Sequence, residues 1–204
     1  ALELADRVAA YSPFADARVI LTSGGSDSVD NACKLARRHW QIEGQTSKKI
    51  ILSREYAYHG LHGYGTSVAG LKFNRDGYGS ESLIPETARV DNSDINRVEV
   101  EILRIGADNI AAIIGEPVMG TGGVIPPAPG YLEGLQRLAA EHNTLIIADE
   151  VITGSGRPGT MIACQRYEVT HDLPLTDRGS TSGDAPTGGC LWHSSGWKQY
   201  SGGW

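Results

Sequence analysis

The sequence lacks the features that mark several common classes of protein. Its longest apolar runs, such as 109–114 and 144–148, are far shorter than the roughly 20 residues that cross a bilayer. Basic residues are outnumbered by acidic ones, 18 against 24, which argues against a surface for nucleic acid or anionic membranes. The three cysteines include no C-x-x-C pair and the N-terminus has no apolar signal core, so we expect free thiols and a cytoplasmic protein.

Glycine, in contrast, is abundant. It makes up 26 of the 204 residues, which predicts many tight turns and close backbone approaches. The apolar fraction of 40% excludes a disordered chain, and the length suggests a single domain. The first residue is not Met, so we expect the chain to begin inside a longer protein.

The apolar pattern predicts an α/β fold. Short β-branched runs predict buried strands at 18–22, 50–53, 110–115 and 144–148, and helical spacing predicts helices at 2–11, 29–40, 94–105 and 132–143. This alternation favours a mostly parallel sheet flanked by helices and joined by right-handed crossovers. The glycine-rich segment 56–79 has no period and is predicted to be a long loop, and no strand or helix is assigned beyond Val151.

Polar residues follow each predicted strand. They are Ser23-Gly24-Gly25-Ser26, Tyr58-His59-Gly60, Glu116 and Asp149-Glu150. In an open parallel sheet ligands bind outside the carboxyl ends of the strands, so these residues are expected to share one pocket. The glycine turn precedes a helix whose free N–H groups would bind a phosphate, although a simple capped helix explains the same pattern. The turn is neither a P-loop nor a dinucleotide fingerprint, because no Gly-Lys-Ser/Thr follows and Val29 replaces the third glycine.

Other residues at this edge admit more than one interpretation. Asp149 could bind Mg²⁺ as in nucleotide hydrolases, although the absence of a P-loop disfavours this. It could instead pair with a protonated ring nitrogen, or it could face solvent without a ligand. Tyr58 either stacks on a planar ligand or packs within its own loop. His59 and His62 have no carboxylate or cysteine at ligand spacing beside them, so no metal is expected.

Four segments, in this order, resemble the class III, or omega, aminotransferases, which are pyridoxal-phosphate enzymes of fold type I. The segments are TSGGSDSVDNACKLARRHW at 22–40, AYHG at 57–60, GEPVMGTGGVIPPAPGYL at 115–132 and LIIADEVITGSGR at 145–157. The resemblance implies that residues 1–167 form the core of the large, cofactor-binding domain and that 168–204 are a poorly matching tail of it. It also implies a fragment that lacks the N-terminal and C-terminal parts of the family's fold.

The resemblance implies a pyridoxal 5'-phosphate site at the predicted pocket. Gly25 and Ser26 would hold the phosphate, and Tyr58 and Val151 would lie on opposite faces of the ring. Asp149 would pair with the ring nitrogen and so keep that nitrogen protonated, which the chemistry of the cofactor needs. The complete set of implied cofactor-binding residues is Gly24, Gly25, Ser26, Tyr58, His59, Asp149 and Val151.

The implied catalytic positions are Asp149, Glu116 and Arg178. Glu116 would lie near the phenolic oxygen of the cofactor and the substrate. The Schiff-base lysine of the family lies in a segment like A-K-G-x-T-S-G-Y, and the matching text here is TDRGSTSGD at 176–184, so Arg178 stands at its position. Arginine stays protonated and cannot attack an aldehyde as a free amine. Asp184 likewise replaces the Tyr of that segment, and Ser155 replaces the Phe of TGFGR.

The function implied by the resemblance is transfer of an amino group from an amine or omega-amino acid to a 2-oxo acid. A homodimer is expected, as in the full-length family, and neither a nucleic acid nor a membrane is an expected partner. Because Arg178 cannot form the covalent bond, the alternative is a non-catalytic, truncated pseudoenzyme that binds the cofactor or a partner.

Overall fold

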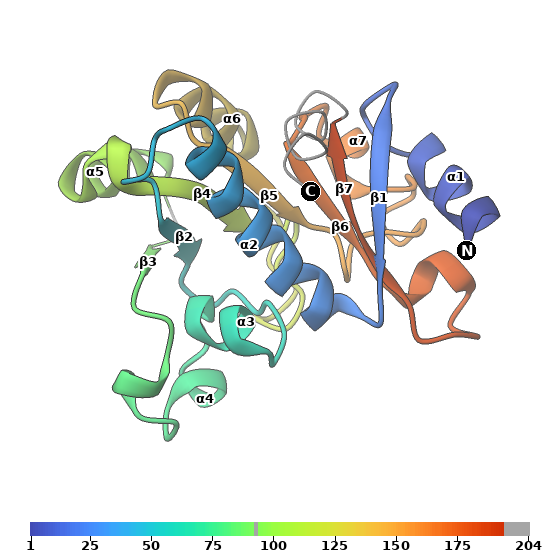
Figure 1. Ribbon diagram of the computed structural model, residues 1–204, viewed down its shortest axis with the longest axis horizontal. Helices are drawn as coiled ribbons and strands as arrows, with labels where there is room; N and C mark the ends of the chain where they lie inside the picture. Colours follow the sequence, from blue (N-terminus) through green and yellow to red (C-terminus); the bar gives the residue numbers. More distant parts are fainter. Residues whose placement is uncertain (92–93, 194–204) are drawn as a thin grey trace.

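A single sheet of seven strands organises the computed structural model, which describes residues 1–91 and 94–193 apart from the side chains of Ser80 and Arg178 (Figure 1). The strands are β1 (Ala17–Thr22), β2 (Ile50–Arg54), β3 (Thr87–Val90), β4 (Ile110–Gly115), β5 (Leu145–Asp149), β6 (Leu173–Thr176) and β7 (Gly188–His193). Their order is β1-β7-β6-β5-β4-β2-β3, and of the described strands only β7 runs in the opposite direction to the other six. The predicted, mostly parallel sheet is therefore confirmed, and the four predicted strands are β1, β2, β4 and β5.

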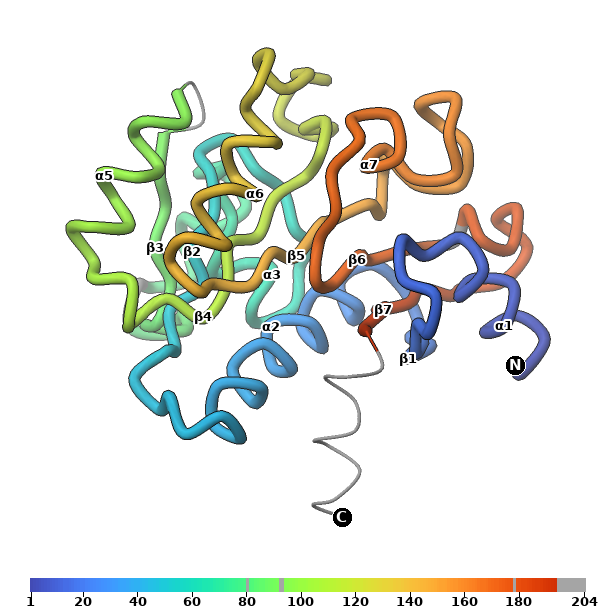
Figure 2. The backbone as a smooth tube through the Cα atoms, turned by 90° about the horizontal axis from the view of Figure 1, so that it is seen from above, coloured from blue at the N-terminus to red at the C-terminus, as the bar shows by residue number. Residues whose placement is uncertain are grey.

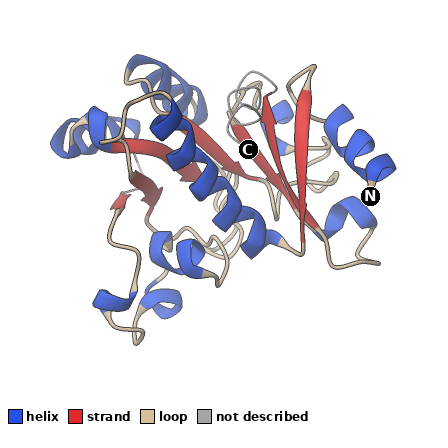
Figure 3. Cartoon of the chain, viewed as in Figure 1, coloured by secondary structure: helices blue, strands red, loops and turns tan. Residues whose placement is uncertain are grey.

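Helices cover both faces of the sheet (Figure 3). They are α1 (Leu2–Ala10), α2 (Gly25–Ile42), α3 (Gly63–Val68), α4 (Lys72–Arg75), α5 (Ile95–Ile105), α6 (Tyr131–Glu141) and α7 (Ala163–Arg166), with short 3-10 turns η1 (Ser80–Ser82), η2 (Ala107–Asn109) and η3 (Arg178–Thr181). Helix α2 lies on one face and α5 and α6 lie on the other, while α1 lies beside the edge strand β1 (Figure 2). Among the described helices, none is both long and apolar enough to span a membrane.

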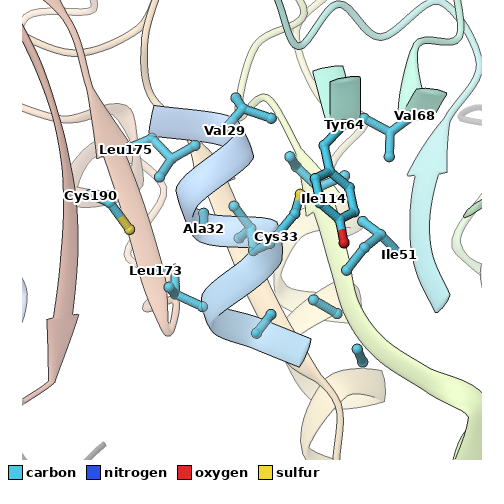
Figure 4. Close-up of a cluster of buried hydrophobic side chains, with 14 of the residues drawn as sticks. Val29, Ala32, Cys33, Ile51, Tyr64, Val68, Ile114, Leu173, Leu175 and Cys190 are labelled. Carbon is cyan, nitrogen blue, oxygen red and sulfur yellow. The ribbon is translucent and has the colours of Figure 1, made fainter. Parts of the chain in front are cut away.

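Helix α2 fills the core on its face of the sheet (Figure 4). Its apolar residues recur at the helical spacing seen in the sequence and form one buried stripe. They are Val29, Ala32, Cys33, Ala36 and Trp40. The indole N–H of Trp40 donates to the carbonyl of Ala111 on β4 at 2.7 Å, which fixes the helix against the sheet. The N-terminus of α2 lies at the carboxyl edge of the strands, because β1 ends at Thr22 and α2 begins at Gly25.

Helices α5 and α6 fill the core on the opposite face. Asp94 caps α5, because its Oδ1 accepts the N–H of Asn96 at 2.9 Å. The two helices approach closely, since a Cβ on Gly134 of α6 would lie 2.5 Å from Ile95 Cγ1 of α5. The two cores enclose β4 and β5, whose residues are almost all buried, and this fixes where the chain leaves each strand.

Three parts of the fold differ from the sequence prediction, and the first is β3 (Thr87–Val90), a strand that was not predicted. Segment 56–79 is not one long loop, because α3 and α4 form within it and Tyr64 and Val68 of α3 join the core. A six-residue helix that contains two glycines is too short to show an apolar period. Beyond Val151, β6 and β7 extend the sheet, although Pro174 and a pair of glycines lower their strand propensity.

Candidate functional site

The carboxyl ends of the parallel strands meet around a cavity of about 450 Å³, a volume typical of small-molecule sites. Its walls come from the turns after β1, β2, β4, β5 and β6. The structure brings together in this lining every predicted site residue except Arg178, whose backbone begins η3 and whose side chain lies outside the described residues. The predicted residues in the lining are Gly24, Gly25, Ser26, Tyr58, His59, Glu116, Asp149 and Val151.

The turn between β1 and α2 forms one wall of the cavity. The first N–H groups of α2 have no acceptor within the helix and carry the positive end of its dipole, so they suit an anion. A Cβ on Gly25 would lie 2.7 Å from Val151 Cγ1. A Cβ on Gly60, whose φ is +90°, would lie 2.5 Å from Ser26 Oγ, which accepts the N–H of Leu61 at 3.1 Å. Only glycine at these two positions lets three turns approach so closely around the helix N-terminus.

Asp149 and His59 form a buried pair at the base of the site. Asp149 ends β5, and its Oδ2 lies 2.7 Å from Nδ1 of His59, with side chains 5% and 0% exposed. The other carboxylate oxygen, Oδ1, accepts the N–H of Val151 at 3.2 Å. The His59 ring therefore fixes the orientation of the carboxylate. The sequence placed both residues at the same edge but did not predict that they bond to each other.

Glu116 is held by two backbone donors. Its Oε1 accepts the N–H of Tyr58 at 3.0 Å and its Oε2 accepts the N–H of Gly120 at 2.8 Å. Burial raises the pKa of Glu116, and the charge of Asp149 raises it further, while His59 and the two N–H donors oppose the shift. A buried carboxyl group in a cleft with a pKa shifted in this direction is typical of groups that take part in proton transfer.

Arg54 supports Glu116 and was not identified from the sequence. It ends β2, is 3% exposed, and its guanidinium donates to the backbone carbonyl of Glu116. The guanidinium also lies over the Tyr131 ring, 5.4 Å from the ring centroid. A Cβ on Gly115 would lie 3.2 Å from Arg54 Nε, so the side chain is enclosed on that side as well. An arginine that directly follows a predicted strand, two residues after its last apolar residue, is the signal that could have marked it.

Three further polar residues line the cavity without having been predicted. They are Asp27, His62 and Asp177. Asp27 Oδ2 accepts both the N–H and the hydroxyl of Ser23 at 3.1 Å, and the N–H bond lowers the pKa of Asp27. Asp177 directly follows β6, a strand that the sequence analysis did not assign, so its place at the carboxyl edge could not be foreseen.

Comparison with known proteins identifies the family of this chain. The model of the class-III aminotransferases matches residues 1–197, so the chain belongs to that family. The chain is 37% identical to an omega-aminotransferase of Caulobacter vibrioides and 35% identical to a beta-alanine-pyruvate aminotransferase of Pseudomonas aeruginosa, each over 204 residues. These alignments cover 92% and 93% of this chain but 46% of each relative. The chain thus spans slightly less than half the length of the curated relatives it matches.

Solved transaminase structures share the fold. An amine transaminase from an uncultivated Pseudomonas species, solved in its PLP-bound form, matches with a TM-score of 0.91 and 34% identity over 97% of this chain and 48% of its own. An (S)-enantioselective omega-transaminase from Thermomicrobium roseum matches with a TM-score of 0.94 and 33% identity over 98% of this chain and 48% of its own. Both solved structures are transaminases that share the α/β architecture of this chain, so the predicted fold class is confirmed.

Proposed function

We propose that the cavity binds pyridoxal 5'-phosphate and that this chain supplies the cofactor site of an aminotransferase. The family reaction moves an amino group from an amine or omega-amino acid to a 2-oxo acid. The proposal is carried by one observation, the meeting of the α2 N-terminus, the Asp149–His59 pair and Glu116 around a single cavity. The printed activities of the relatives and the PLP-bound neighbour support it.

The glycine turn fits a phosphate group. The N–H groups of Gly25 and Ser26 open α2, where an anion is favoured by the free donors and by the helix dipole. Because Ser26 Oγ accepts the N–H of Leu61, the proton of this hydroxyl is free to be donated to a ligand. Gly24 completes the turn. These residues would bind and orient the phosphate.

The walls and base of the cavity fit an aromatic ring with a protonated nitrogen. Tyr58 and Val151 would flank the ring. Asp149 would hold the proton on the ring nitrogen, because its carboxylate is kept in place by His59 and by a backbone N–H. When bound there, the cofactor supplies an electron sink for the substrate. Glu116, held by the N–H groups of Tyr58 and Gly120, would lie near the phenolic oxygen of the cofactor.

Covalent attachment of the cofactor requires an amine at the site. The lysines of the chain are Lys34, Lys48, Lys49, Lys72 and Lys198, and none of those within the described residues lines the cavity. Arg178 stands at the matched position and keeps its proton. We therefore expect weak, non-covalent cofactor binding and no transamination by this chain as it stands. That behaviour defines the second candidate function, a non-catalytic cofactor-binding pseudoenzyme, which Arg178 favours.

Association as a homodimer and a cytoplasmic location are also part of the proposal. Several large apolar side chains are exposed, and contact with a second copy would cover them. They include Tyr56, Leu61, Phe73, Tyr78, Val124 and Ile125. All three cysteines are free and buried, as in proteins of a reducing compartment.

Borohydride reduction after incubation with pyridoxal 5'-phosphate tests the proposed function. We expect the parent chain to change the absorbance of the cofactor reversibly and to carry no stoichiometric adduct on any one lysine when its peptides are mapped. The variant Arg178→Lys should gain one adduct, at residue 178. Arg166→Lys is the matched control, because it adds a lysine at an exposed position of α7 outside the cavity and should gain none.

Two results would contradict the proposal. A stoichiometric adduct on one lysine of the parent, with amine-dependent turnover, would show that another amine takes the place of the missing lysine. Absence of reversible binding by the parent and by Arg178→Lys would show that the cavity is not a cofactor site.

A further inference from the structure

The carboxylates that line the cavity differ in how their oxygens are held. Asp149 Oδ2 lies 2.7 Å from His59 Nδ1. Glu116 accepts two backbone N–H groups, and Asp27 accepts both the N–H and the hydroxyl of one serine. The fourth carboxylate belongs to Asp177, and its Oδ1 is buried with no hydrogen-bond partner in the described part of the chain. A buried carboxylate oxygen without a partner is costly and calls for a specific explanation.

Asp177 lies beside the glycine turn. A Cβ on Gly24 would be 3.9 Å from Asp177 Oδ1, which places the carboxylate next to the N-terminus of α2. The backbone that carries it is well held. The Asp177 carbonyl accepts the N–H and the hydroxyl of Ser180, each at 3.0 Å. The carbonyl of Thr176 accepts the hydroxyl of Ser28, a residue of α2, at 3.4 Å. The segment after β6 is therefore fixed to the same helix that forms the turn.

We propose that Asp177 selects against dianionic groups at the glycine turn and so determines how tightly the site holds a phosphate-bearing ligand. The inference rests on the proposed function, because it places the phosphate of the ligand at the N-terminus of α2. A phosphate monoester carries a charge of roughly −1.5 to −2 at neutral pH. A carboxylate a few ångströms away repels it most strongly where protein excludes water.

Two opposite charges thus act on the same position. The N–H groups and the dipole of α2 attract a phosphate, whereas the unpaired oxygen of Asp177 repels it. A neutral hydroxymethyl group at the same place meets no such repulsion. The site should therefore bind a phosphorylated ring compound and its unphosphorylated counterpart with similar affinities. Without the repulsion by Asp177, the N–H groups of the turn would favour the phosphorylated compound much more strongly.

Three probes that carry no aldehyde test this inference without reacting with lysines. They are pyridoxine 5'-phosphate, pyridoxine and inorganic phosphate, each titrated calorimetrically into the parent chain and into Asp177→Asn. We expect the substitution to raise the affinity for both phosphate probes by about tenfold or more and to leave the affinity for pyridoxine unchanged. Asp184→Asn is the matched control, because it removes an exposed acid of the same segment that does not line the cavity, and it should change none of the three.

Each outcome decides between the two claims. Equal affinities of the parent and Asp177→Asn for pyridoxine 5'-phosphate would overturn the inference and leave the proposed function intact. An equal rise for Asp184→Asn would overturn it as well, because net charge alone would explain the effect. If neither phosphate probe binds any of the chains, the inference and the proposed function both fail.

Thermal unfolding separates an effect on binding from an effect on folding. Asp177→Asn should unfold at or above the temperature of the parent, because it removes the charge from a carboxyl group whose Oδ1 is buried without a hydrogen-bond partner in the described part of the chain. Asp177→Ser removes the charge with a different side chain and should show the same rise in affinity for the phosphate probes. Loss of that rise in Asp177→Ser would show that the amide of asparagine, and not removal of the charge, strengthens binding.

Discussion

The substitution Gly25→Ala measures how far the site depends on the close approach of two turns. A Cβ at this position would lie 2.7 Å and 2.9 Å from the two Cγ atoms of Val151, well inside the ~3.5–4.0 Å of an ordinary contact. Overpacking of this kind costs about 1–3 kcal/mol. Alanine recovers up to about 1 kcal/mol of helix propensity relative to glycine. We therefore expect a net loss of about 1–2 kcal/mol in the free energy of unfolding.

Urea unfolding followed by circular dichroism measures this loss, with the midpoint compared at a constant slope. The matched variant is Val151→Ala, which removes the two methyl groups that the new Cβ would meet. The double variant should lose less stability than the sum of the losses of the two single variants. We expect the difference to be about 1 kcal/mol or more in the free energy of unfolding. The same variants titrated with pyridoxal 5'-phosphate show whether the turn has moved, and Gly25→Ala alone should bind more weakly.

Either of two results would contradict this expectation for Gly25→Ala. One is a Gly25→Ala variant as stable as the parent, since the close contact with Val151 would then be relieved without cost. The other is strict additivity in the double variant, which would mean that the loss comes from the backbone at residue 25 and not from Val151.

Two further predictions concern pH and association. Burial lowers the pKa of His171 from 6.5 to about 4, so the native state excludes a proton that the unfolded chain takes up, and stability falls by about 3 kcal/mol as the pH drops through this window. His171→Gln should lose this part of the pH dependence in urea titrations, and identical pH profiles of the two chains would argue against it. The exposed apolar side chains predict that the chain self-associates, so sedimentation velocity should show species larger than a monomer that grow with concentration. A compact monomer at the highest concentration would contradict that expectation.

The strongest sequence patterns predicted the fold most accurately. The five-residue apolar stripe of α2 and the buried runs of β2 and β5 could be read directly, because period and burial agree over the whole element. The strands β6 and β7 could not be predicted from the sequence, because β6 contains Pro174 and β7 begins with Gly188 and Gly189. Gly188 is needed for packing, since a Cβ there would lie 2.7 Å from Thr22 Oγ1. At Gly188, the need for close packing against β1 therefore outweighs the low strand propensity of glycine.

The candidate site was predictable where it depends on strand direction. Residues that follow parallel strands share one edge, so Gly25, Tyr58, Glu116 and Asp149 line the same cavity. The bonds between them were not predictable, because they depend on side-chain placement across the sheet. The short contact of Asp149 with His59 is one example, and the support of the Glu116 segment by a buried arginine is another.

The departures from the family pattern that bear on cofactor binding come from one short segment. The turns after β1, β2, β4 and β5 bring the proposed binding and proton-holding groups, whereas the segment from β6 into η3 brings Asp177 and Arg178 in place of the A-K of the family segment. On the proposed function, Arg178 removes the amine that would bond to an aldehyde, and Asp177 adds a negative charge beside the phosphate turn. Both changes act in the same direction, because each lowers the affinity for a phosphate-bearing aldehyde. Neither Asp177 nor Arg178 takes part in the hydrogen bonds that hold Glu116 and Asp149. Substitutions in this segment alone should therefore change cofactor binding and turnover separately.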